Sequence, residues 1–167
     1  QLLIHSLYSN KDIFLREIIS NGSDALDKLK YLTVSDEAYK NIKFEPRLDI
    51  SFDEKNSVLV VQDSGIGMND EDLQNNLGTI ARSGTKAFLS KLTSEASKDS
   101  NLIGQFGVGF YSAFMAAKRI DVYTRKAAGD GKIWHWSSDG TNSYDLDEVS
   151  AESEIARKYG FDNPELS

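Results

Sequence analysis

An amphipathic helix is the feature that most constrains how this chain can fold. From about residue 11 to residue 32, apolar residues recur with the 3.6-residue period of an α-helix. Such a helix must bury its apolar face against another layer, and strand signals follow it in the sequence. Leu48, Ile50 and Phe52 alternate with polar residues, which predicts a strand with one buried face.

More strand signals follow, interleaved with shorter helix signals. A polar turn at 54–57 leads into the apolar run 58–61, which predicts a central strand. A short helix is expected over 69–77, where Asn69 can act as the N-cap, and another over about 110–117. A hairpin of two strands is expected within 120–136. This order predicts an α+β fold, with a helix layer packed on a mixed or antiparallel sheet.

The composition excludes several functional classes. The 167 residues contain no cysteine, so disulfides, thiolate zinc sites and cysteine nucleophiles are excluded. Nineteen basic against 26 acidic residues give a formal charge of −7, which disfavours nucleic acid and anionic membranes as partners. No apolar run approaches the roughly 18 residues of a membrane span. Because the chain starts without Met inside a helical pattern, we expect a piece of a longer protein.

A polar stripe runs along the long predicted helix. Its members are Glu17, Asn21, Asp24 and Lys28. At about 100° per residue they lie within an arc of about 60°, beside the apolar face, where a cleft floor would place them. The alternative is a solvated face with an Asp24–Lys28 ion pair worth about 0.3–0.5 kcal/mol. The pair Asn21-Gly22 favours the functional interpretation, because both residues are poor choices for a helix interior.

Two glycine-rich loops carry further chemistry. Asp63 follows an apolar strand and opens the loop that ends at Met68; a carboxylate there can accept a hydrogen bond from an exocyclic amine, although an ordinary turn is equally compatible. The loop 104–109 precedes a predicted helix, where backbone amides hold phosphate well, and a tight packing loop is its alternative. The histidines, His5 and His135, lack a metal-site context, so we expect packing or surface roles.

Four blocks of sequence, in this order, resemble a known family. They are EIISNGSDALDK at 17–28, DSGIGM at 63–68, NLGTIA at 76–81 and IGQFGVGFYS at 103–112. Together they resemble the N-terminal ATP-binding domain of the heat-shock protein 90 chaperones, in its bacterial form, over about residues 2–139. The resemblance implies the Bergerat fold, a two-layer α/β sandwich with a helix layer on a mixed, mostly antiparallel sheet.

The resemblance also implies roles for the matching residues. Glu17 resembles the general base that activates the hydrolytic water, and Asn21 resembles the Mg²⁺ ligand. Asp63 resembles the reader of the adenine amine, with Gly67 in its water network and Met68 packed on the base. We expect the remaining ATP-binding residues to be Asp24, Lys28, Asn76, Leu77, Arg82, Gly107, Val108, Gly109 and Phe110. The family usually has Lys where this chain has Arg82.

The implied activity is hydrolysis of ATP to ADP and phosphate, slow in this isolated piece, with ATP or ADP and Mg²⁺ as ligands. The implied protein is a cytoplasmic chaperone, a homodimer at full length, in which nucleotide controls the closure of a lid and of the dimer clamp. It acts on client proteins through the rest of the parent chain. This piece is expected to be a monomer that binds neither nucleic acid nor membrane. Two alternatives remain: another Bergerat-fold ATPase of the topoisomerase or mismatch-repair type, or a nucleotide-binding switch module without hydrolysis.

The domain boundaries are also expectations. Residues 1–145 are expected to form the ATP-binding domain, truncated at its N-terminus. Residues 146–167 are expected to be an acidic tail, either an insertion or an incomplete domain end. The family's G-T-x-I motif near the end of the domain is not recognisable in this sequence.

Overall fold

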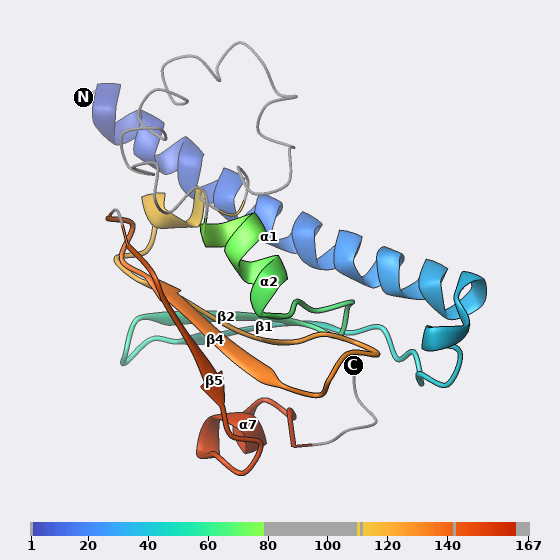
Figure 1. Ribbon diagram of the computed structural model, residues 1–167. Helices are drawn as coiled ribbons and strands as arrows, with labels where there is room; N and C mark the ends of the chain where they lie inside the picture. The colour runs from blue at the N-terminus through green and yellow to red at the C-terminus, as the bar shows by residue number, and fades with distance from the viewer. Residues whose placement is uncertain (1, 79–109, 111, 142, 163–167) are drawn as a thin grey trace. The chain divides into compact units, whose positions relative to one another are not determined.

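The computed structural model describes residues 2–78, 110, 112–141 and 143–162 (Figure 1). The elements, in chain order, are the helix α1 (Leu2–Ser35), the 3-10 turn η1 (Glu37–Tyr39), the strands β1 (Leu48–Asp53) and β2 (Val58–Asp63), the helix α2 (Asp70–Leu73), the π turn η2 (Gln74–Gly78), the 3-10 turn η3 (Ser112–Met115), the strands β3 (Ile120–Arg125), β4 (Ile133–Ser138) and β5 (Asp145–Val149), and the helix α7 (Glu154–Lys158). The long helix is confirmed, and it extends back to Leu2, so the helical pattern at the start of the chain belongs to the same helix.

The chain divides into two compact units, which are described separately. The first comprises Gln1–Asn21, Asp70–Val122 and His135–Asp147, and the second comprises Gly22–Asn69, Tyr123–Trp134 and Glu148–Ser167. Among the described residues, the core of the first unit includes Leu73, Leu77, Ala113, Phe114 and Trp136. That of the second unit includes Leu29, Ala127, Ile133 and Ala156.

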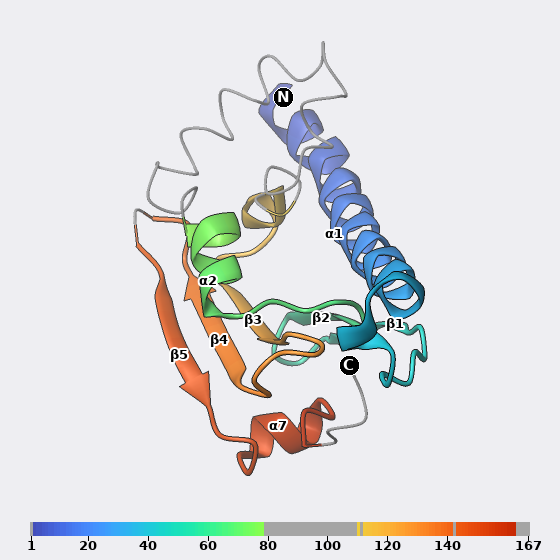
Figure 2. The ribbon, with the colours of Figure 1, turned by 45° about the vertical axis from the view of Figure 1, so that its right-hand side comes forward.

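The described strands form two sheets. In the first, β1 and β2 are antiparallel, with Leu48 opposite Asp63, and the predicted turn at 54–57 connects them. In the second, the order is β3-β4-β5, and β3 and β4 form the predicted hairpin (Figure 2). The fold is therefore mixed α+β, as predicted.

Two predictions about burial are wrong. The alternating strand was expected to bury one face, but Ile50 and Phe52 of β1 are 48% and 65% exposed. The run 58–61 was expected to be a central strand, yet within the described residues β2 pairs with β1 alone, and Val58 and Leu59 are exposed. A two-stranded sheet buries apolar side chains only where another element covers it, and local sequence does not specify that cover.

Three segments differ from expectation in form. The helix expected over 69–77 begins as α2 but continues as the π turn η2. Within the helix expected over 110–117, the described residues contain the 3-10 turn η3, which ends where two successive amides, those of Ala116 and Ala117, donate to the Ala113 carbonyl. Inside the expected acidic tail, β5 continues to Val149 and α7 follows, capped by Ser153. The domain boundary at residue 145 stays a prediction.

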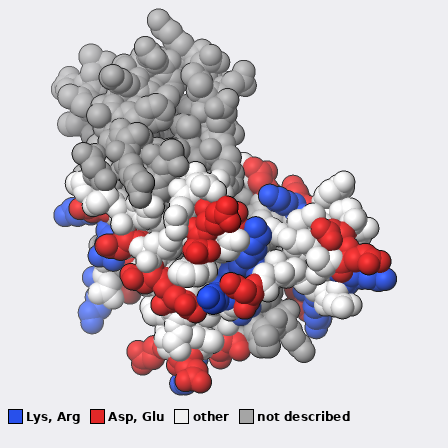
Figure 3. All heavy atoms as spheres, in the orientation of Figure 1, with Lys and Arg blue, Asp and Glu red and all other residues white. Residues whose placement is uncertain are grey.

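The described surface carries both signs of charge. On the face drawn in Figure 3, acidic and basic side chains are interspersed. Of the helices that the structure describes, none combines the length and the apolar character needed to cross a membrane.

Candidate functional site

Asp63 ends β2 where the chain enters the loop 64–68. Its Oδ1 accepts a hydrogen bond from the Gly65 amide at 2.9 Å. Although the residue is exposed, desolvation of its carboxyl outweighs this hydrogen bond and raises the pKa of Asp63 above the ordinary value of 3.8. Among the described residues, Oδ2 has no hydrogen-bond partner. Oδ2 is therefore an acceptor oxygen whose negative charge is not compensated by a hydrogen-bond donor of the described residues.

Two glycines allow α1 to approach this carboxyl closely. A Cβ atom built on Gly22 would lie 2.5 Å from Leu48 Cδ1 and 3.7 Å from Asp63 Oδ2. A Cβ atom built on Gly65 would lie 2.6 Å from the carbonyl carbon of Ala25. The contact at Gly65 is with backbone and favours glycine, whereas the Leu48 methyl near Gly22 can shift to make room for a small side chain. Gly65 therefore has a packing role against α1.

The loop is held between α1 and the end of β3. The Ile66 amide donates to the Ala25 carbonyl at 3.1 Å, and the Ala127 amide donates to the Ile66 carbonyl at 2.8 Å. Gly67 has a φ of +68°, and a Cβ atom on it would collide with the carbonyl oxygen of Arg125. Only glycine satisfies both the conformation and the contact. The predicted special role of glycine in this loop thus has a structural basis.

Thr124 is a loop contact that sequence reasoning missed. Its Oγ1 accepts a hydrogen bond from the Met68 amide at 2.9 Å, and the residue is only 8% exposed. Its position in the sequence could have identified it, because Thr124 shares one face of β3 with Ile120 and Val122. A hydroxyl at the end of such an apolar face usually has a hydrogen-bond partner.

The polar stripe lies on one continuous helix, as predicted, but its members differ in burial. Glu17 and Asn21 are half-buried, whereas Asp24 and Lys28 are exposed. Glu17 and Asn21 belong to the first unit, and the other two belong to the second. Because Asp24 and Lys28 are exposed, these two residues also fit the alternative of a solvated helix face.

The other candidate residues with described positions belong to the first unit. On η2, Asn76 is half-buried and Leu77 is 3% exposed. Phe110 packs edge to face on Trp136, with ring centroids 5.9 Å apart and an interplanar angle of 70°. Leu77 and Phe110 therefore have packing roles. Four predicted residues lie outside the described residues: Arg82, Gly107, Val108 and Gly109.

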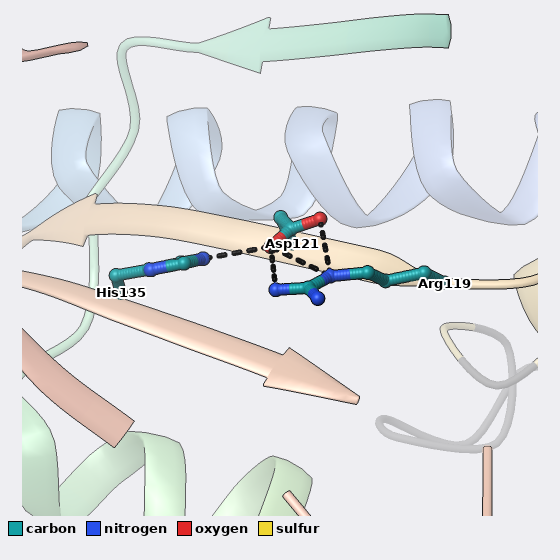
Figure 4. Close-up of polar contacts among 3 residues, drawn as sticks. All are labelled: Arg119, Asp121 and His135. Atoms are coloured by element: carbon teal, nitrogen blue, oxygen red, sulfur yellow. Dashed lines mark hydrogen bonds and ion pairs between the residues drawn. The ribbon is translucent and has the colours of Figure 1, made fainter. Parts of the chain in front are cut away.

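A charged cluster in the first unit was not expected. Asp121 of β3 lies between Arg119 and His135, with its Oδ1 2.8 Å from His135 Nε2 and 3.1 Å from an Arg119 amino nitrogen (Figure 4). Burial raises the pKa of Asp121, but the hydrogen bonds from Arg119 and His135 outweigh burial, and the pKa lies below 3.8. His135 thus makes a specific hydrogen-bonded contact with Asp121 of the neighbouring strand.

The chain is similar to known proteins over most of its length. The family model described as "Histidine kinase-, DNA gyrase B-, and HSP90-like ATPase" matches residues 8–160. The chain is 70% identical over 148 residues to "Chaperone protein HtpG" of Treponema denticola, which covers 89% of this chain and 23% of that protein. Proteins of the same name from Treponema pallidum and Campylobacter jejuni are 65% and 60% identical, over 90% and 92% of this chain.

The chain spans about a quarter of the length of these relatives. The family model covers more than nine-tenths of this chain, and the resemblance found in the four sequence blocks is confirmed. The chain belongs to the histidine kinase-, DNA gyrase B- and HSP90-like ATPase family, within which it is similar to the bacterial HtpG chaperones.

Proposed function

We propose that this chain binds ATP and hydrolyses it, as the nucleotide-binding domain of a molecular chaperone. The observation that carries the proposal is the Asp63 carboxyl, which is held by Gly65 through one oxygen and left with a second acceptor oxygen beside the loop. An exocyclic amine, such as N6 of adenine, is the donor that this oxygen suits. Gly67 and Met68 follow in the loop that Thr124 holds, so the base would lie against this loop.

The catalytic and phosphate-binding roles are further parts of the proposal. Glu17 would act as the general base for the attacking water, and Asn21 would bind Mg²⁺ through its side-chain oxygen. No group of three His, Asp or Glu side chains suited to a metal occurs among the residues that the structure describes. Mg²⁺ usually takes few protein ligands and keeps water and phosphate oxygens, so a single amide oxygen fits it. The proposed phosphate and ribose contacts are Asp24, Lys28, Asn76, Leu77, Arg82 and residues 107–110.

For the whole protein, we propose a cytoplasmic homodimeric chaperone that acts on client proteins. Nucleotide would control the closure of its two subunits around each other. The similarity to the HtpG chaperones supports this proposal. The described elements would belong to a two-layer Bergerat sandwich, with the helices on one face of a mixed, mostly antiparallel sheet. The isolated chain would be a slow ATPase and a monomer.

Calorimetric titration with ADP and ATP, in the presence of Mg²⁺, tests the adenine site. The Asp63→Asn variant should lose at least about tenfold in affinity, or about 1.4 kcal/mol, because an amide accepts from the adenine amine less strongly than a carboxylate. Asp49→Asn is the matched control: Asp49 lies on the adjacent strand and pairs at the surface with Arg47 at 2.9 Å. Equal affinities for the two variants would contradict the assignment.

Single-turnover hydrolysis tests the proposed general base. Glu17→Gln should lower the rate about 10²- to 10⁴-fold while the affinity for ATP stays the same, because only proton abstraction is lost. Glu37→Gln, on the exposed turn η1, is the control. A wild-type chain that binds ATP without any hydrolysis would instead support the switch-module alternative.

A further inference from the structure

The turn that follows α7 joins strands from two different sheets. Gln62 Nε2, on β2, donates to the Tyr159 carbonyl at 2.6 Å. Arg125 Nη1, on β3, donates to the Phe161 carbonyl at 2.6 Å. We name residues 159–161 the C-terminal clamp. All of these residues belong to the second unit.

Ring contacts reinforce both ends of the C-terminal clamp. The Tyr159 ring stacks on Tyr123 of β3, with centroids 6.3 Å apart and an interplanar angle of 27°. The Arg125 guanidinium lies over the Phe161 ring, 6.0 Å from its centroid. The turn itself is closed by a 2.8 Å hydrogen bond from the Phe161 amide to the Ala156 carbonyl. The clamp is therefore a defined structure with contacts to both strands.

The two strand residues that hold the clamp are sequence neighbours of the two residues that hold the nucleotide loop. Gln62 precedes Asp63, and Arg125 follows Thr124. Successive side chains of a strand point to opposite faces of the sheet. On β2, the clamp therefore contacts the face opposite to the Asp63 side chain. On β3, it contacts the face opposite to the Thr124 side chain.

We propose that the C-terminal clamp sets the distance between the ends of β2 and β3 and thereby positions the loop 64–68 for adenine. Gln62 and Arg125 are then positioning residues, which act through the backbone of Asp63 and Thr124. This inference rests on the proposed role of Asp63 in reading adenine and adds a determinant of base specificity. Among the described residues, β2 and β3 belong to different sheets, so no strand pairing joins them. The C-terminal clamp joins them instead.

Base selectivity should be especially sensitive to this geometry. Adenine presents an amine donor where guanine presents a carbonyl acceptor, so a correctly placed carboxylate favours adenine and repels guanine. A carboxylate displaced from its position loses the hydrogen bond to adenine, and its repulsion of guanine also weakens. Displacement therefore lowers the ratio of the two affinities.

The first experiment compares Gln62→Met and Arg125→Met with the wild type in titrations with ADP and with GDP. Methionine keeps a long unbranched side chain but cannot donate to the clamp carbonyls. Each variant should bind ADP about tenfold more weakly, or about 1.4 kcal/mol, and its ADP-to-GDP selectivity should fall. Simple destabilisation of the fold would lower both affinities equally and leave the selectivity unchanged. Arg157→Met, on the exposed side of α7, is the matched control and should behave as the wild type.

The second experiment needs no nucleotide. Hydrogen exchange of the amides of Gly65, Ile66 and Met68 should be faster in Gln62→Met and Arg125→Met than in Arg157→Met. These three loop amides donate to Asp63, Ala25 and Thr124, so a displaced loop loses their protection. The double variant should be no worse than Gln62→Met alone, because the Gln62 hydrogen bond is the one that joins the clamp to β2, whereas β3 also contacts it through Tyr123.

A substitution that strains the backbone of the clamp tests the same proposal independently. Gly160, in the clamp, has a φ of +80°, and Gly131, in the β3–β4 turn, has a φ of +79°; a Cβ atom on either would meet nothing within 4 Å. Valine at either position therefore introduces the same backbone strain, but only Gly160→Val should speed exchange in the loop.

The outcomes separate the two proposals. Unchanged loop exchange and unchanged selectivity in the clamp variants, with normal ADP binding by the wild type, would overturn the clamp proposal alone. Faster loop exchange in a chain that binds no ADP would refute the nucleotide function while supporting the structural link. Equal effects of Arg125→Met and Arg157→Met would also overturn the clamp proposal.

Discussion

Replacement of Gly67 by alanine gives the sharpest test of how the nucleotide loop is held. The residue has a φ of +68°, and an added Cβ atom would collide with the Arg125 carbonyl oxygen. The left-handed conformation costs about 1–2 kcal/mol in an L-residue. To relieve the collision the loop must withdraw from β3, which breaks the hydrogen bond from the Met68 amide to Thr124. Loss of this part-buried hydrogen bond adds about 0.5–1.5 kcal/mol.

Gly131→Ala is the matched control, because Gly131 has a φ of +79° and a Cβ atom there would meet nothing within 4 Å. It should carry only the conformational cost of about 1–2 kcal/mol, and both variants share the same gain from a stiffer unfolded chain. The difference between the two variants therefore isolates the contact with β3. It amounts to about 1 kcal/mol, or about 2–4 °C in Tm for a chain of this size.

Thermal and urea unfolding of the two variants, followed by far-ultraviolet circular dichroism, measure this difference. Titration with ADP should show that Gly67→Ala also weakens binding, while Gly131→Ala does not. If the two variants melt within about a degree of each other, the contact between Gly67 and β3 does not hold the loop, and the reasoning is refuted.

Three further predictions concern single side chains. Thr124→Val should leave the Met68 amide unpaired and lower the free energy of unfolding by about 1–3 kcal/mol in urea titrations; an unchanged midpoint would contradict this. Without nucleotide, Asp63→Asn should be more stable than the wild type at pH 7, because the raised pKa of Asp63 means that its charged form is disfavoured in the fold. This gain should disappear as the pH falls below 3.8, and thermal melts that show a less stable variant at pH 7 would refute it. Asp121, whose pKa is lowered, should stabilise the fold fully above pH 3.8 and lose that contribution as the pH falls through its lowered pKa. The stability gap between wild type and Asp121→Asn should therefore shrink in acid melts, and a constant gap would count against the cluster with Arg119 and His135.

Local patterns predicted most of the described elements. The period of 3.6 residues located α1, the turn residues at 54–57 located the β1–β2 hairpin, and the two strand signals within 120–136 located β3 and β4. These predictions succeeded because periodicity and turn chemistry depend on neighbouring residues. The predicted burial of β1 and β2 failed, because burial depends on which distant element covers a strand.

The candidate site shows the same difference between local sequence signals and contacts between distant segments. Asp63 and Gly67 were identified from sequence, because a carboxylate after an apolar strand and a glycine in the following loop are local signals. Thr124 and Arg125, which donates to the C-terminal clamp, were not identified, since each contacts a segment more than 30 positions away in sequence. No local pattern records a contact at that separation.

The sequence by itself therefore determined the element types, the loop chemistry around Asp63 and the membership of the ATPase family. Only the tertiary structure decided which faces are buried, why Gly65 and Gly67 carry no side chain, and how β2 and β3 are linked through the C-terminal clamp. The physical reason is that conformational preference is a property of neighbouring residues, whereas desolvation, close approach and hydrogen bonding between strands arise only when distant segments meet.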